Sequence, residues 1–170
     1  MAIYYGDGGN SSVGRVVQVA YDSSTSEDSG TETSFTNTGL IDLTFGSNVT
    51  SGNKVLLHLQ LGMGENYDSA WAQHAAFRIY CDTQGGLGHS TWGQTGGWVS
   101  GTASAGSNMQ YGFQRMSGML LYTPTTTTPR YRLYRRRIAT GWSMTVGSSH
   151  HSSVNYNSGQ TQLTAMEIAA

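Results

Sequence analysis

Apolar residues recur at every second position along much of this chain, and that alternation limits its fold more than any other feature. Side chains of a β-strand point alternately to the two faces of its sheet, so this spacing predicts strands with one buried and one wetter face. The clearest example is residues 54–61, in which every odd position is apolar: Val55, Leu57, Leu59 and Leu61. The predicted strands cover residues 13–21, 41–45, 54–61, 77–81, 109–113, 118–123, 130–139, 142–146 and 161–168.

The composition also favours a β-protein. Charged residues make up only 11% of the 170 residues, and glycine, serine and threonine take the place of the helix-forming glutamate, lysine and arginine. About nine or ten short strands separated by polar turns are typical of a sandwich or jelly roll. We therefore predict an all-β fold, a jelly-roll-like β-sandwich. The length fits a single domain over residues 13–170, preceded by an N-terminal arm at residues 1–12.

Three segments depart from the alternation. Residues 22–33 are acidic and rich in serine and threonine, and we expect an exposed, mobile loop there. Residues 62–76 fit either a short helix around residues 69–75 or a long loop. Residues 85–106 are rich in glycine, threonine and tryptophan, which favours an extended loop or a pair of twisted strands.

Opposite charges are separated along the sequence although the formal net charge is −1. Nine acidic and three basic residues lie in residues 1–100, whereas residues 101–170 hold one acidic residue and six arginines. The two halves either interleave inside one sandwich, or the acidic part of one subunit pairs with the arginines of a neighbour. Arginine suits the second role because its planar fork makes bidentate pairs with carboxylates. The residues of this intersubunit hypothesis are Arg130, Arg132, Arg135, Arg136 and Arg137.

The sequence lacks the residue patterns of the common enzyme sites. It has no nucleophile elbow, no phosphate-binding loop and no dinucleotide fingerprint, and its histidines lack the spacing of a metal site. We therefore expect no enzymatic activity, with no catalytic residue, no metal site and no cofactor. No apolar run is long enough to span a membrane, so we expect no membrane partner.

Two binding functions are suggested by aromatic and basic residues. Arginines alternate with tyrosines in residues 130–137, a pattern that can track phosphates and stack on bases. We expect no nucleic-acid partner, because the net charge is slightly negative and the alternation sends these arginines to both faces of a strand. Aromatic side chains of the glycine-rich loops either stack on the rings of a bound sugar or close the sandwich core or a subunit interface. They are Trp71, Trp92, Trp98 and Tyr111.

Short motifs at both ends of the chain resemble those of a known group of proteins. The chain opens with Met-Ala-Ile-Tyr-Tyr-Gly-Asp-Gly-Gly-Asn and continues with Gly-Arg-Val-Val-Gln-Val at residues 14–19. It is similar to small virion proteins of tailed phages that infect marine bacteria, especially cyanobacteria, which commonly open with MAIYYGDGSN and a Gly-Arg-Ile-Ile-Gln-Val strand. Further matches are Thr-Gly-Leu at residues 38–40, Ser-Gly-Asn-Lys-Val at residues 51–55 and the closing strand at residues 163–168.

The resemblance implies a structural protein of the phage virion, assembled in the cytoplasm of the host bacterium. We expect a surface decoration, short fibre or tail component that forms a homotrimer and contacts the major capsid or tail protein. In this hypothesis the N-terminal arm docks on a partner through Ile3, Tyr4, Tyr5 and Asp7. The alternative is a receptor-binding module that recognises a host surface glycan through the loop aromatics.

Overall fold

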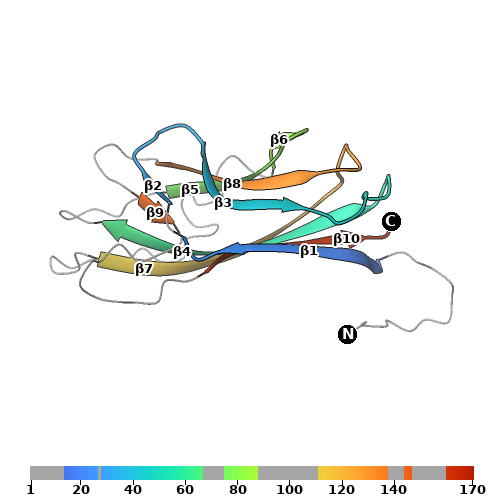
Figure 1. The fold of residues 1–170 in the computed structure, drawn as a ribbon, viewed down its shortest axis with the longest axis horizontal. Helices are drawn as coiled ribbons and strands as arrows, with labels where there is room; N and C mark the ends of the chain where they lie inside the picture. Colours follow the sequence, from blue (N-terminus) through green and yellow to red (C-terminus); the bar gives the residue numbers. More distant parts are fainter. Residues whose placement is uncertain (1–13, 27, 67–74, 88–110, 138–143, 147–159) are drawn as a thin grey trace.

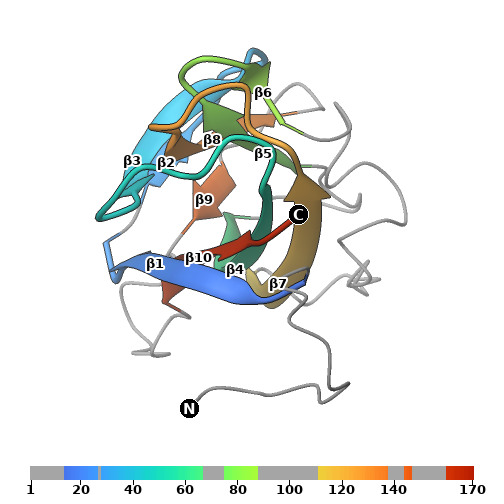
Figure 2. The ribbon, with the colours of Figure 1, turned by 90° about the vertical axis from the view of Figure 1, so that its right-hand side faces the viewer.

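The chain forms two antiparallel β-sheets that pack face to face (Figure 1). The computed structural model describes residues 14–26, 28–66, 75–87, 111–137, 144–146 and 160–170. Ten strands and no helix occur within these ranges. An end-on view shows the two layers with the core between them (Figure 2). The prediction of an all-β fold is thus confirmed for the described residues.

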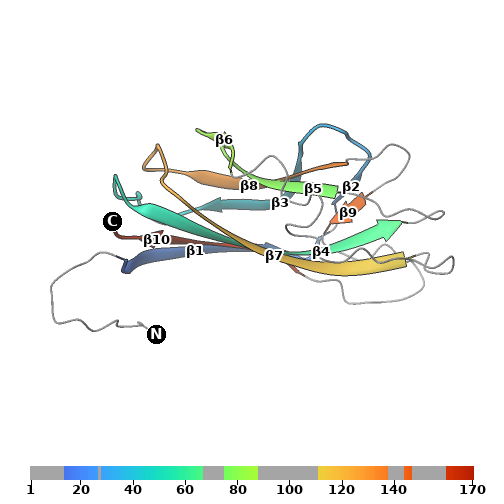
Figure 3. The same ribbon diagram turned by 180° about the vertical axis from the view of Figure 1, so that it is seen from behind.

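The larger sheet is built around the first, central and last strands of the chain. Its strand order is β1-β10-β4-β9-β2, and β7 pairs with the other edge of β4. The view from behind shows β7 running beside β4 (Figure 3). The bounds are β1 (Val16–Ser24), β2 (Asp28–Gly30), β4 (Lys54–Asn66), β7 (Tyr111–Tyr122), β9 (Met144–Val146) and β10 (Thr161–Ile168).

The smaller sheet covers the apolar face of the larger one. Its strand order is β3-β8-β5-β6. The bounds are β3 (Thr36–Thr44), β5 (Ala75–Cys81), β6 (Gly85–Gly86) and β8 (Arg130–Arg137). The chain therefore passes repeatedly between the two sheets, so most strand contacts join residues far apart in the sequence.

The predicted apolar faces meet in the core. Val55, Leu57, Leu59 and Leu61 of β4 are all buried, as are Leu163 and Ala165 of β10. From the smaller sheet Phe77, Ile79, Cys81, Tyr131 and Leu133 pack against them. Cys81 follows Phe77 and Ile79 at alternate positions of the predicted strand over residues 77–81 and is buried with them.

A pair of tyrosines satisfies its hydroxyl groups inside the sandwich. Tyr122 donates a hydrogen bond of 2.8 Å to the hydroxyl of Tyr131, and the two rings meet edge to face. Burial raises the pKa of both tyrosines, so both stay protonated at neutral pH. Each ring thus adds apolar area to the core without leaving its hydroxyl unpaired.

Several predicted loops are wrong. The strand predicted over residues 54–61 continues as β4 to Asn66, where β7 pairs with it, so the loop or helix expected from residue 62 cannot begin there. The two strands predicted at residues 109–113 and 118–123 are one strand, β7, because β4 offers an uninterrupted partner. At the start of residues 85–106, for which a loop or twisted strands were expected, Gly85 and Gly86 form the short strand β6 against β5.

The acidic segment at residues 22–33 is also more ordered than predicted. Its first residues extend β1 to Ser24, and its middle forms β2 against β9. Asp28 and Glu32 bind Arg135, a residue 107 and 103 positions away respectively. The local sequence offers this segment nothing to bury, and the distant arginine supplies what orders it.

Glu167, in the last strand, is hydrogen-bonded to a residue of β1 and to the turn before β4. This buried carboxylate accepts hydrogen bonds from the Gln18 side chain at 2.6 Å, the Thr50 backbone at 2.8 Å and the Asn53 side chain at 2.6 Å. Gly52, with φ of 89°, makes the turn that brings Asn53 there. Burial raises the pKa of Glu167, but these hydrogen bonds outweigh burial, and the net pKa lies below its ordinary value.

We predict that Glu167→Gln lowers the free energy of unfolding at pH 7 by about 1–3 kcal/mol, because the new amide places N–H groups against N–H donors. A carboxyl with a lowered pKa contributes stability above its unfolded pKa and loses it as the pH falls through the folded value. The difference between variant and wild type should therefore shrink below pH 4.5. Urea unfolding at neutral and acidic pH measures both effects. Asp82→Asn, at an exposed carboxylate, is the control. A stability difference between Glu167→Gln and wild type that does not change with pH would contradict the role assigned to Glu167.

Candidate functional site

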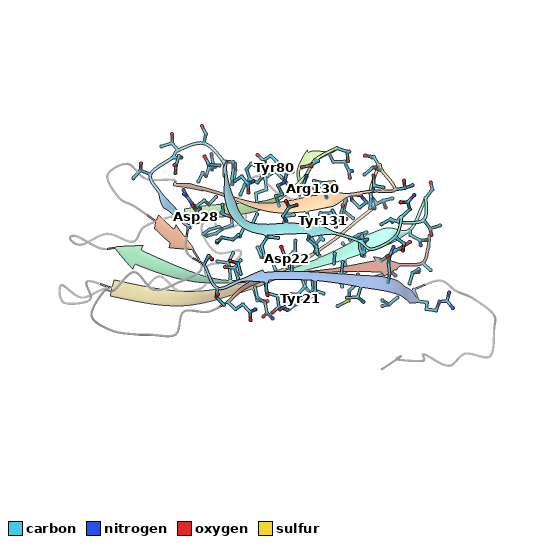
Figure 4. The ribbon with its side chains drawn as sticks, viewed as in Figure 1. Tyr21, Asp22, Asp28, Tyr80, Arg130 and Tyr131 are labelled. Carbon is cyan, nitrogen blue, oxygen red and sulfur yellow. The ribbon has the colours of Figure 1, made fainter. Side chains whose placement is uncertain are left out.

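The arginine strand β8 divides its side chains between the core and the outside. Tyr131, Leu133 and Arg135 are buried, whereas Arg132, Tyr134 and Arg136 are half-buried on the opposite face. Figure 4 shows Tyr131 between the two sheets and Tyr80, of the neighbouring strand β5, on the outer side. The predicted division of the arginines between two faces is confirmed for these side chains.

Two outward arginines form ion pairs at the surface. Arg130 makes a bidentate pair with Asp42 of β3, in which Nε donates to Oδ1 at 2.6 Å. Arg132 lies 3.3 Å from Asp82 and 3.9 Å from Asp42. The hydrogen bond from Arg130 holds the pKa of Asp42 below its ordinary value. Because these groups are largely solvated, such pairs contribute little to stability.

Arg135 points inward and forms the one buried ion cluster among the described residues. Its side chain is 3% exposed and pairs with Asp28 through two nitrogens and with Glu32 at 2.6 Å. The hydrogen bond from Arg135 lowers the pKa of Glu32. The guanidinium lies over Gly30, where a Cβ atom would collide with it. Glycine at this place in β2 therefore makes room for the cluster.

These contacts show that some of the acidic and basic residues separated in the sequence pair within one chain. Arg130, Arg132 and Arg135 find carboxylates from residues 28–82 of the same chain, so for them the acidic and basic halves interleave. Arg136 contacts Phe35 instead, with its Cζ atom 4.9 Å from the ring centroid. Arg137 lies in β8 opposite Ala75, and its side chain is outside the described residues. Pairing with a neighbouring subunit stays a prediction.

The other predicted site residues fall mostly outside the described part of the chain. They are Ile3, Tyr4, Tyr5 and Asp7 of the proposed arm and the loop residues Trp71, Trp92 and Trp98. The backbone of Tyr111 begins β7 opposite Asn66, but its side chain is not described. The anchoring hypothesis and the glycan-binding alternative therefore stay predictions.

The outer face of the larger sheet is apolar, which the sequence analysis did not anticipate. Met119 is 66% exposed and Val19 58%, and Tyr21 points away from the core (Figure 4). The strand register aligns Val19 with Met166, Leu56 and Leu121 in one row across four strands. We call this surface the apolar outer face: Val16, Val17, Val19, Tyr21, Leu56, Met119, Leu121 and Met166.

Polar side chains on the same surface are mainly uncharged. His58 binds the Ser117 hydroxyl at 3.0 Å, and Thr164 lies between Tyr21 and His58 in the register. Among the residues of this face whose side chains the structure describes, Lys54, at the end of β4, is the charged one. The sequence contains a sign of this apolar face, since the outward-facing even positions of β4 and β10 include Leu56, Met166 and Ile168. Large contiguous apolar patches on protein surfaces are typical of interaction sites.

The described ranges contain neither a cluster of metal-binding side chains nor a membrane-spanning helix. No group of three or more histidine, cysteine, aspartate or glutamate side chains could hold a metal ion there. In the same residues no helix is long and apolar enough to cross a membrane. No protein-family model and no curated protein matches the chain.

We predict that Arg135→Ala lowers the free energy of unfolding by about 1–3 kcal/mol, because it removes the charged hydrogen bonds of a buried arginine to Asp28 and Glu32. Arg130→Ala is the matched control, since it removes the same side chain from an exposed pair on the same strand and should change stability far less. Chemical denaturation of the two variants measures the difference. Equal losses of stability in Arg135→Ala and Arg130→Ala would show that the ion pairs of Arg135 stabilise the fold no more than an exposed pair does.

Proposed function

We propose that this chain is a structural protein of a phage virion that assembles into a homo-oligomer through its apolar outer face. The observation that carries the assembly is the row Val19, Met166, Leu56 and Leu121, in which Val19 and Leu121 are exposed and the other two half-buried. Covering apolar surface is favourable by about 25 cal/mol per Å². The proposed role is mechanical, without catalysis or a cofactor.

A second copy is the partner that suits this face best. Near the threefold axis of a trimer the same residues of all three subunits approach one another, so charged residues there would meet like charges. An almost uncharged surface avoids that repulsion. Subunit interfaces of homo-oligomers are also more apolar than the rest of a protein surface. We propose a homotrimer, in which each apolar outer face is covered by its neighbours.

The strand order supports a jelly-roll form of the sandwich. The two four-strand sets β1-β10-β4-β7 and β3-β8-β5-β6 are joined by a chain that moves from one sheet to the other. Double-sheet jelly rolls have eight main strands arranged as two Greek keys, and β2 and β9 would be short additions to that scheme. Such domains are common in viral particles.

The place in the virion rests on the motifs at both ends of the chain. Their similarity to small virion proteins of marine phages supports a surface decoration, a short fibre or a tail component. In this proposal residues 1–12 form an arm that docks on the major capsid or tail protein, and the sandwich is presented outside.

We predict that Met119→Glu weakens self-association by at least about tenfold, because it buries an unpaired charge between subunits. Thr44→Glu is the control, since it adds the same charge at an exposed position of the smaller sheet. Sedimentation velocity over a range of concentrations gives the oligomeric state of both variants and the wild type. A wild-type chain that stays monomeric at micromolar concentration would contradict the assembly.

A second prediction concerns the particle. Quantitative mass spectrometry of purified virions should detect the chain, with hundreds of copies for a capsid decoration and a few dozen or fewer for a tail or fibre. Deleting residues 1–12 should leave a folded protein that is lost from the particle. Absence of the full chain from virions would contradict the virion role, and normal incorporation of the deletion variant would contradict the arm.

A further inference from the structure

The outer face of the smaller sheet carries a row of aromatic rings. Tyr80 of β5 stacks on Tyr134 of β8, with 4.1 Å between ring centroids and 29° between ring planes. Phe35, just before β3, packs against Tyr80 at 6.1 Å. All three side chains are half-buried, and Tyr80 lies on the side of the sheet opposite the core (Figure 4). The rings therefore form a partly exposed apolar platform.

Two arginines are held against this platform. The Cζ atoms of Arg78 and Arg136 lie 5.0 and 4.9 Å from the centroid of the Phe35 ring, within the range of cation–π attraction. Arg78 also lies over Gly86, where a Cβ atom would be 2.6 Å from its Nη1 atom. These contacts restrict the conformations of the arginine side chains in the unbound protein. We call the surface of Phe35, Arg78, Tyr80, Tyr134 and Arg136 the arginine–aromatic face.

The two guanidiniums lack acceptors within the described chain. The Nε atoms of Arg78 and Arg136 are buried and make no hydrogen bond among the described residues, and neither arginine has an ion pair there. A buried donor without an acceptor costs about 1–3 kcal/mol. Because both arginines contact one ring, two positive charges also share a small region. An anion beside the guanidiniums would accept hydrogen bonds from their Nη atoms and reduce the repulsion.

The described carboxylates of a second copy are already engaged. Asp28 and Glu32 bind Arg135, Asp42 binds Arg130, and Asp82 pairs with Arg132. Asp22 accepts the backbone N–H groups of Ser23 and Asp42, and Glu167 is buried among its own donors. An acidic segment of a different protein can reach Arg78 and Arg136 without breaking these pairs.

We propose that the arginine–aromatic face binds an acidic peptide segment of another protein. Carboxylates of the segment accept hydrogen bonds from Arg78 and Arg136, whose planar forks suit bidentate pairing. Its apolar side chains lie on Tyr80 and Tyr134. Tyrosine and arginine are enriched among the residues that dominate binding energy in interfaces. The inference goes beyond the proposed function and stands without it, because it uses the sheet opposite the apolar outer face.

The test measures peptide binding to the full chain by fluorescence anisotropy. The probe is a labelled short peptide in which aspartate alternates with leucine, compared with the same peptide carrying asparagine. The aspartate peptide should bind more tightly, and high salt should weaken it. Combining Arg78→Ala with Arg136→Ala should raise its Kd at least about tenfold. Arg130→Ala, which removes an outward arginine already paired with Asp42, should leave the Kd within about twofold.

Two further measurements keep the test decisive if the double alanine variant does not fold. The double variant Arg78→Lys with Arg136→Lys keeps both charges but lacks the planar guanidinium groups that make bidentate hydrogen bonds. It should still weaken peptide binding several-fold. Hydrogen exchange of the wild type should slow in β5 and β8 when the peptide is added. Equal binding of the asparagine peptide, or an equal loss in Arg130→Ala, would overturn the proposal. So would tighter binding of an oligogalacturonate or of oligo-dT, since the ligand would then be a glycan or a nucleic acid.

Discussion

The insertion of β10 between β1 and β4 is the interaction on which the rest of the structure depends. Backbone hydrogen bonds on both edges of β10 place the last strand of the chain in the interior of the larger sheet. Its Glu167 then accepts hydrogen bonds from Gln18 and from the turn before β4. Buried backbone and carboxylate groups must find partners, so these contacts join the beginning, middle and end of the described chain into one unit.

Each sheet uses one face for the core, and the two remaining faces differ in chemistry. The larger sheet leaves an apolar, almost uncharged surface, which suits contact with an identical copy. The smaller sheet leaves arginines and tyrosines, which suit an acidic partner. A sandwich with two such faces can be held in an assembly by one sheet and present the other to a different protein. In the proposed function, this separation would let one chain be a structural subunit and also bind a specific partner.

The sequence predicted the described core well and the charged and aromatic contacts poorly. Leu57, Ile79 and Leu163 are buried as the alternation indicates, and β10 has the predicted bounds of residues 161–168. The acidic segment around Asp28 was expected to be mobile, because its own residues contain nothing that would order it. Arg135, 107 residues away, orders it. The contacts of Phe35 with Arg78 and Arg136 join three separate segments in the same way.

The sequence by itself determined the strands with alternating apolar residues and the burial of those apolar side chains, because period-two hydrophobicity is a local property of a pleated chain. The tertiary structure alone decided which strands became neighbours. That choice produced the row of apolar side chains on the larger sheet and left two arginines around Phe35 without carboxylates in the described chain. Both surfaces depend on the register between strands distant in the sequence, and register is set by packing and backbone pairing across the whole sandwich.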